Sequence, residues 1–89
     1  METNDARRKR MSMRSWRRGT KEMDLILGPY SDAHLVHMSE TELRIYDRLL
    51  EENDTDLLPM ILGQQAPPEY LTEMIEKIGG FARARLQRG

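Results

Sequence analysis

The 89-residue chain has no cysteine, so neither disulfides nor thiolate metal ligands can hold its fold together. Aromatic residues are also scarce: there are one Phe, one Trp and three Tyr. The hydrophobic core must therefore be modest, and we expect a net stability of only a few kcal/mol. A domain of this size leaves little room for a deep catalytic cleft.

Long apolar runs are absent as well. No stretch approaches the roughly 20 apolar residues that span a bilayer, and no apolar segment follows the basic N-terminus as in a secretory signal. We therefore expect no membrane span and a cytoplasmic location in a bacterium. A mitochondrial matrix location is the alternative for a eukaryotic chain, although Glu2 and Asp5 fall where transit peptides avoid acids.

Motifs for catalysis and metal binding are missing too. No serine stands in a G-x-S-x-G setting, and no glycine cluster precedes Lys-Ser or Lys-Thr as in a phosphate loop, so we predict no catalytic residue. His34 and His37 lie three residues apart with Asp32 nearby, a spacing that places two imidazoles on one helix face. Because no second helix offers a Glu-x-x-His partner, we interpret them as ordinary histidines and predict no metal site.

Charge is strongly segregated along the chain. Residues 1–18 carry +5, residues 19–76 carry −10 and residues 77–89 carry +4. The basic run "RRKRMSMRSWRR", with Trp16, is compatible with binding to nucleic acid or to an anionic membrane surface, because clustered arginines neutralise phosphates and an indole can stack on bases. A docking surface for an acidic protein gives the same pattern, and the acidic middle would repel a polyanion. We therefore rank nucleic acid below a protein partner.

Helix signals divide the first half of the chain into two segments. Asp5 is predicted to cap a helix containing Met11, Met13 and Trp16, and Gly19 to end it in a left-handed conformation. A second helix is predicted from Thr20. The stretch "GPYSD" at residues 28–32 is expected to interrupt it, because proline cannot donate a helical hydrogen bond.

The second half carries the clearest start signal, "MSETEL", in which Ser39 and Glu42 form a capping box. Asn53 is expected to end this helix and Asp56 to cap a fourth, with Pro59 at its third position. Residues 63–68 read as a linker before a last helix whose predicted inward stripe is Leu71, Met74, Ile75, Ile78 and Ala82. The pattern predicts one all-α domain over residues 1–89, a compact bundle of about five short helices with residues 1–10 and 84–89 frayed.

The stretch "RRGTKEMD", residues 17–24, resembles the Arg-Gly-x-x-Glu motif of the succinate dehydrogenase FAD assembly factors, or flavinators, with Arg18, Gly19 and Glu22 as motif residues. Downstream, "MSETELRIYDRLLEENDTDLLPMILG" is similar to the second conserved block of that family. The resemblance covers roughly residues 6–80 and is far more specific than a five-residue motif. Met60 replaces the usual Trp, and Tyr30 stands where Phe is frequent, so local packing can differ.

This resemblance implies a five-helix assembly chaperone and not an enzyme. Members of the family bind the flavoprotein subunit of succinate dehydrogenase, and in some bacteria that of fumarate reductase, and promote covalent attachment of FAD to one of its histidines. The FAD belongs to the client, and the resemblance implies no cofactor bound stably by the chaperone itself.

For the site, we interpret Gly19 as a junction without a side chain that a partner backbone can approach closely. Arg17 and Arg18 stand on one side of it, Glu22 and Asp24 on the other, and these five residues form the predicted partner-binding edge. The simpler alternative is that Arg18 and Glu22 only pair with each other across an ordinary helix end. At the level of function, the alternatives are a small nucleic-acid-associated regulator or antitoxin that uses the basic N-terminal helix, and a purely structural subunit.

Overall fold

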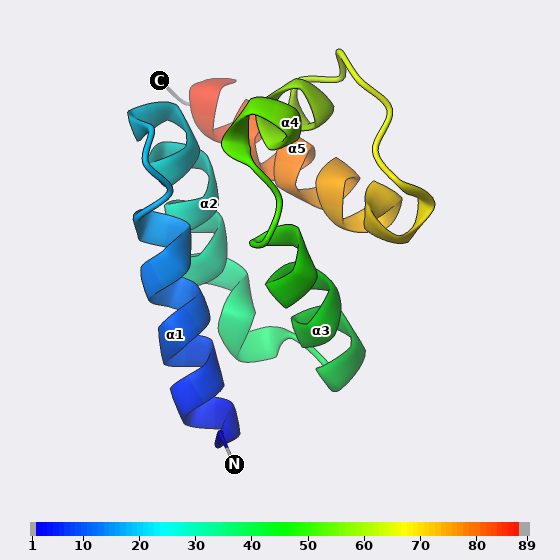
Figure 1. The fold of residues 1–89 in the computed structure, drawn as a ribbon. Helices are drawn as coiled ribbons and strands as arrows, with labels where there is room; N and C mark the ends of the chain where they lie inside the picture. Colours follow the sequence, from blue (N-terminus) through cyan, green and yellow to red (C-terminus); the bar gives the residue numbers. More distant parts are fainter. Residues whose placement is uncertain (1, 88–89) are drawn as a thin grey trace.

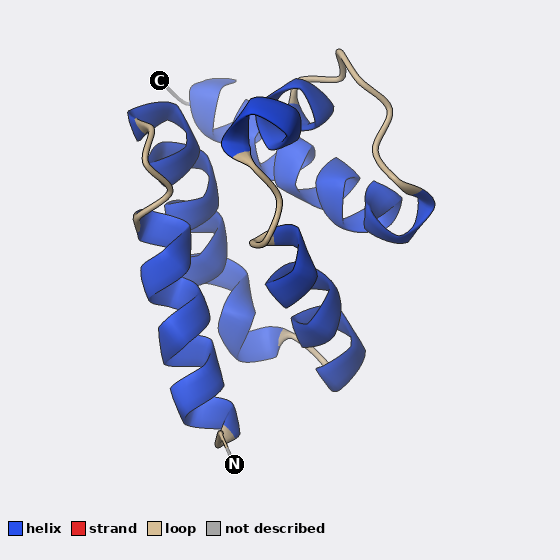
Figure 2. Cartoon of the chain, viewed as in Figure 1, coloured by secondary structure: helices blue, strands red, loops and turns tan. Residues whose placement is uncertain are grey.

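The computed structural model describes residues 2–87, with side chains through residue 85, and is all-helical over that range. Figures 1 and 2 show an α1–α2 hairpin, with α3 beside its lower half and α4 and α5 packed at its upper end. The predicted all-α bundle of five short helices is confirmed. The helices are α1 (Asn4–Trp16), α2 (Lys21–His34), α3 (Glu40–Leu49), α4 (Asp54–Ile61) and α5 (Thr72–Gln87), with 3-10 turns at Leu35–His37 and Glu69–Leu71.

One apolar core joins all five helices. The basic helix α1 contributes Met11, which is fully buried, whereas Met13 and Trp16 lie 48% and 40% exposed. The predicted inward stripe of the last helix is confirmed for its first four members, while Ala82 is only half-buried. The remaining core side chains are aliphatic or aromatic groups of α2 to α4 and their connections: Met23, Leu27, Tyr30, Leu35, Met38, Leu43, Tyr46, Leu49, Leu50, Leu57, Met60 and Ile61.

The predicted interruption of the second helix at residues 28–32 is wrong, because α2 continues through Gly28 and Pro29 to His34. Gly28 is buried, and a Cβ placed on it would fall on the indole of Trp16. The glycine is therefore required for the contact between α1 and α2, and this packing outweighs its low helix propensity. The 3-10 turn Leu35–His37 then follows α2 directly.

Two predicted helix starts are also corrected. Thr3, and not Asp5, caps α1, since its hydroxyl accepts a hydrogen bond from the Ala6 N–H. In α4 the cap position is Asn53, so Asp56 lies inside the first turn instead of capping it. Pro59 accordingly sits deeper in the helix than predicted. Asn53 therefore begins α4 and does not end α3, which stops at Leu49.

The capping box that opens α3 is confirmed. The Ser39 hydroxyl accepts from the Glu42 N–H, and the Glu42 carboxylate accepts from the Ser39 N–H. At the chain ends, α1 includes residues 4–10 and α5 includes residues 84–87, so fraying there stays a prediction. Residue 1 and residues 88–89 lie outside the described range. Within residues 2–87, none of the helices is both long and apolar enough to cross a bilayer.

Candidate functional site

The turn between α1 and α2 presents its glycine to solvent. Gly19 is exposed with φ +104°, a conformation that side chains rarely adopt, and no atom beyond its chain neighbours lies within 4 Å of where its Cβ would be. Thr20 then caps α2, its hydroxyl accepting from the Met23 N–H at 3.4 Å. The positive φ predicted for Gly19 is confirmed, although it occurs beyond the actual cap residue of α1, Arg17.

Arg18 holds this turn against the turn between α3 and α4. Its side chain is only 7% exposed, and Nε lies 2.9 Å from Asp54 Oδ1. Its two terminal nitrogens each donate at 2.7 Å, one to the Leu50 carbonyl and one to the Glu52 carbonyl. The alternative of an Arg18–Glu22 pair is thus not what the structure shows, because the guanidinium is bound by groups on the opposite turn.

Asp24 supports the same turn from within α2. Its Oδ1 accepts a hydrogen bond of 2.6 Å from the Arg18 backbone N–H. The carboxylate is half-buried and faces back toward the turn. Of the five predicted partner-binding residues, Arg18 and Asp24 are therefore bound inside the protein, whereas Arg17, Gly19 and Glu22 are exposed.

A groove of about 590 Å³ separates the two turns and is lined by Arg14, residues 17–20 and residues 50–55. One wall carries arginines, and the other carries acidic side chains such as Glu51 and Asp54. Glu22 does not line this groove; it lies at the edge of a second, apolar groove. The acidic wall was not predicted as part of the site, although the opposite charges of residues 1–18 and 19–76 were a signal that these segments would pair.

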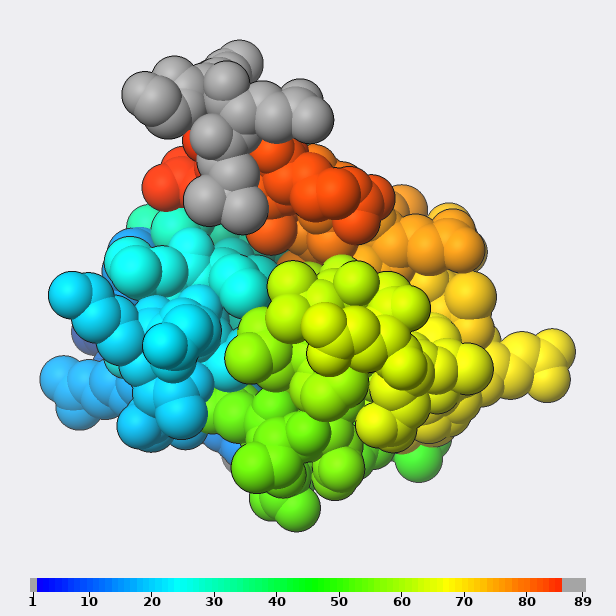
Figure 3. Space-filling model, turned by 90° about the horizontal axis from the view of Figure 1, so that it is seen from above, coloured from blue at the N-terminus to red at the C-terminus, as the bar shows by residue number. Residues whose placement is uncertain are grey.

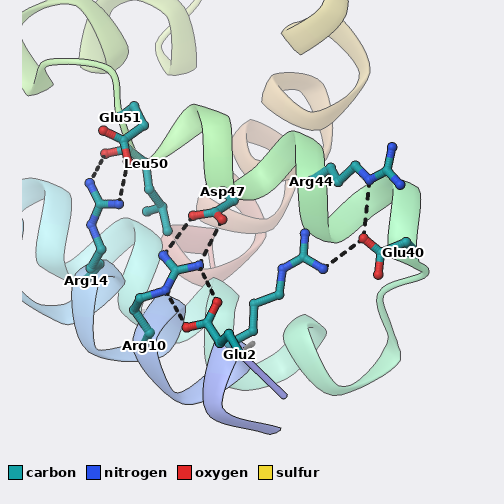
Figure 4. Close-up of polar contacts among 9 residues, drawn as sticks. Glu2, Arg10, Arg14, Glu40, Arg44, Asp47, Leu50 and Glu51 are labelled. Carbon is teal, nitrogen blue, oxygen red and sulfur yellow. Dashed lines mark hydrogen bonds and ion pairs between the residues drawn. The ribbon is translucent and has the colours of Figure 1, made fainter. Parts of the chain in front are cut away.

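That pairing extends along the whole of α1. Arg7 lies 2.8 Å from Glu40, Arg10 forms a two-point contact with Asp47, and Arg14 lies 2.8 Å from Glu51. Figure 4 shows Arg10 and Arg14 reaching toward α3 from one side of α1, with Arg14 also donating to the Leu50 carbonyl. We call Arg7, Arg10, Arg14 and Arg18, with their carboxylate partners, the arginine ladder. Four of the seven basic residues in residues 1–18 are thus paired within the protein, which leaves less positive charge for binding a partner than the sequence suggested.

Because of the ladder, we expect the free energy of unfolding to decrease at acid pH. The hydrogen bond from Arg10 lowers the pKa of Asp47, and that from Arg7 lowers the pKa of Glu40. In the capping box, the Ser39 N–H lowers the pKa of Glu42. A carboxyl group whose pKa is lowered by folding stabilises the protein above its unfolded-state pKa, and this contribution is lost as the pH falls through the folded-state pKa.

We therefore expect the midpoint of urea unfolding to stay nearly constant between about pH 7 and pH 5 and to fall below about pH 4.5. Fluorescence of Trp16, the single tryptophan, reports the transition. In Asp47→Asn, the midpoint should be lower at neutral pH and the acid-induced fall smaller than in the wild type. Equal midpoints at about pH 3 and pH 7 in the wild type would contradict a stabilising ladder.

Beneath the ladder, a buried polar pair joins α1 to α3. Ser15 donates to the Met11 carbonyl at 2.8 Å and lies 2.6 Å from the Tyr46 hydroxyl. Since the only hydroxyl proton of Ser15 is used, Tyr46 must donate in this pair. Burial raises the pKa of Tyr46 to about 12, so the phenol stays protonated and can donate. This bond fixes the axial register of α1 against α3.

The two histidines lie in different environments. The His34 ring lies 4.4 Å from the Tyr30 ring and 5.3 Å from the Phe81 ring, within an aromatic cluster of α2 and α5. His37 falls in the 3-10 turn and is exposed. Residues 2–87 contain no group of three or more His, Asp or Glu placed to hold a metal ion.

Comparison with known proteins gives a consistent result. Residues 9–82 match the family described as flavinator of succinate dehydrogenase. The chain is 39% identical over 67 residues to the mitochondrial succinate dehydrogenase assembly factor 2 of Caenorhabditis elegans, covering 73% of this chain and 56% of that protein. It is 31% identical over 74 residues to the FAD assembly factor SdhE of Legionella pneumophila (strain Lens), covering 83% and 94%.

The zebrafish (Danio rerio) mitochondrial assembly factor 2 is 34% identical over 87 residues, covering 94% of this chain and 55% of that protein. The chain thus spans about half the length of these mitochondrial relatives and nearly all of the bacterial one. The matched residues 9–82 run from α1 into α5 and include both turns of the groove. On this match, the chain belongs to the family of flavinators of succinate dehydrogenase.

Proposed function

We propose that this protein is an assembly chaperone that binds the flavoprotein subunit of succinate dehydrogenase and promotes covalent attachment of FAD to it. The observation that carries the proposal is the motif turn itself. Gly19 is exposed, strained for any other residue and open to a partner, while Arg18 fixes the turn from within. The positive φ alone would require a glycine at a helix end, so it is the open space around Gly19, next to the exposed Arg17 and Glu22, that supports a docking role.

In this proposal the five motif-region residues have two kinds of role. Arg17, Gly19 and Glu22 contact the client, since they are exposed. Arg18 and Asp24 position them, because the two residues bind the opposite turn and the turn backbone. Three internal hydrogen bonds and an ion pair lower the conformational freedom of the turn before binding, and this reduces the entropy lost on docking.

The chaperone works in this proposal by preorganising its client and not by catalysis. A rigid docking edge holds the FAD domain of the flavoprotein so that the flavin and the acceptor histidine stay near reacting distance. The bond-forming chemistry belongs to the flavin and its host, and the chaperone binds no FAD stably. We place this reaction in the bacterial cytoplasm, or in the mitochondrial matrix for a eukaryotic chain, and extend the proposal to the flavoprotein of fumarate reductase.

The test replaces Glu22 with glutamine, which keeps the shape of the side chain but removes its charge. Glu22 is exposed on the first turn of α2, so folding stability should change by less than about 0.5 kcal/mol. We expect the yield of covalent flavin in the co-expressed flavoprotein to fall severalfold, measured by in-gel flavin fluorescence. Each flavoprotein, of succinate dehydrogenase and of fumarate reductase, is assayed separately.

The matched control is Glu69→Gln, another exposed carboxylate, in the 3-10 turn before α5. It should leave flavin attachment unchanged. Full flavin attachment with Glu22→Gln would remove Glu22 from the docking edge. If flavin attachment is the same with and without the wild-type chaperone, the proposed function is wrong.

The regulator or antitoxin alternative is disfavoured by the arginine ladder. Arg7, Arg10, Arg14 and Arg18 are paired with carboxylates of the same chain, and Arg8 donates to the Leu35 carbonyl at 3.1 Å. A nucleic acid would have to compete with these partners for the same cations, and would meet the acidic residues of α3 as it approached.

A further inference from the structure

A second groove lies beside the motif, between α2, the end of α4 and α5. Its volume is about 480 Å³, and its lining is largely apolar. Figure 3 looks onto this end of the molecule, where the cyan start of α2, the yellow-green end of α4 and the orange part of α5 meet. The apolar side chains of the lining come from all three helices and the cap residue of α4: Leu25, Ile26, Ile61, Leu62 and Ala82.

Two of these side chains are unusually exposed. Leu25 is 53% exposed and Leu62 is 56% exposed, although they come from different helical segments and converge on one groove. A lone exposed leucine is ordinary. Two leucines on one concave surface, backed by the buried Ile61, form a site whose burial by a partner is energetically favourable. The groove therefore has the composition of a binding site for an apolar side chain.

The base of the groove depends on a glycine in α5. Gly79 is buried, and a Cβ there would lie 3.1 Å from the Ile61 carbonyl oxygen and 3.2 Å from Arg83 Nη1. Without that side chain α5 packs closely on the end of α4, and the Arg83 guanidinium lies over the glycine. This close packing explains why α5 has glycine, a residue of low helix propensity, at position 79.

Charged groups of opposite sign border the groove. Glu22 lines it from α2, and Arg83 and Arg85 line it from α5; all three side chains are exposed. Glu22 is also a motif residue on the proposed docking edge, so the groove continues that edge. The arrangement is complementary to a segment with an apolar residue in the groove, a basic residue near Glu22 and an acidic residue near the arginines.

We infer that this groove is a second contact for the flavoprotein client and takes an amphipathic segment of that subunit, anchored by a large aliphatic or aromatic side chain. The inference rests on the proposed function. Binding of the client then spans the polar turn at Gly19 and the apolar groove, with Glu22 shared between them. The apolar contact supplies affinity, and the charged border fixes the orientation of the segment.

The test compares Leu25→Gln and Leu62→Gln with Val36→Gln, a control on an aliphatic residue that is 66% exposed outside the groove. Affinity for the purified flavoprotein, loaded with non-covalent FAD, is measured by calorimetry, and folding is checked by thermal unfolding. We expect each groove variant to weaken binding about three- to tenfold, since only the exposed half of each leucine remains to be covered, and the control to bind as the wild type does. Arg83→Glu combined with Arg85→Glu should also weaken binding.

The outcomes distinguish a failure of the inference about the groove from a failure of the proposed function. Wild-type-like affinity of both leucine variants, with weakened binding of Glu22→Gln, would overturn the groove and leave the proposed function in place. Absence of any binding by the wild-type protein would overturn both. If sedimentation equilibrium shows a wild-type dimer that both leucine variants abolish, the groove joins two copies of this chain and the inference is also wrong.

Discussion

Replacing Arg18 with alanine is expected to lower the free energy of unfolding by about 3–5 kcal/mol, the range for removing one partner of a buried charge pair. The substitution leaves Asp54, itself only 14% exposed at its side chain, without its cation. It also removes one hydrogen bond to the Leu50 carbonyl, which keeps Arg14 as a donor, and the hydrogen bond to the Glu52 carbonyl. For a domain of this size we expect Tm, measured by circular dichroism, to fall by more than about 10 °C.

Arg17→Ala is the matched control, because the neighbouring arginine is exposed and its loss should change stability by no more than about 0.5 kcal/mol. Arg18→Lys keeps the charge but cannot span three acceptors in different directions, so its Tm should lie between those of the wild type and Arg18→Ala. If Arg18→Ala melts at the temperature of Arg17→Ala and yet abolishes flavin attachment, Arg18 is a direct client contact and the assignment of a positioning role to it fails.

The status of Arg18 marks the limit of reading this site from sequence. The motif correctly located an exposed glycine turn, because a positive φ at Gly19 is a local property of the chain. Which arginine is exposed depends on Asp54, 36 residues away, and on the carbonyls of the α3–α4 turn. The opposite charges of residues 1–18 and 19–76 did indicate that the two segments would form ion pairs, but not which arginine would be buried.

Helix boundaries show the same division. The capping box at Ser39 was predictable because all of its hydrogen bonds are made within four residues. The continuation of α2 through Gly28 and Pro29 was not, since it depends on Trp16 packing from another helix. Proline removes the donor to the Leu25 carbonyl, but Leu25 lies on an exposed part of α2, where water can replace that bond.

The role of Gly28 leads to the second large expected effect. A Cβ at position 28 would overlap the six-membered ring of Trp16, which also donates through Nε1 to Asp32 at 3.2 Å. In Gly28→Ala the indole must leave its place between α1 and α2, because helix backbones cannot separate locally without disturbing the core. We expect a loss of about 1–3 kcal/mol, despite the better helix propensity of alanine.

The fluorescence of Trp16 reports its own environment, since it is the single tryptophan of the chain. Its emission in the folded Gly28→Ala protein should shift to longer wavelength as the ring becomes more hydrated, and urea unfolding measures the loss of stability. Gly80→Ala is the matched control: Gly80 is also helical, and no atom outside its own helical turn lies within 4 Å of its added Cβ. That variant should be as stable as the wild type or gain up to about 1 kcal/mol, with unchanged emission. Equal stabilisation of both alanine variants would mean that Trp16 does not rest on Gly28, and that the indole contact is not what keeps α2 uninterrupted.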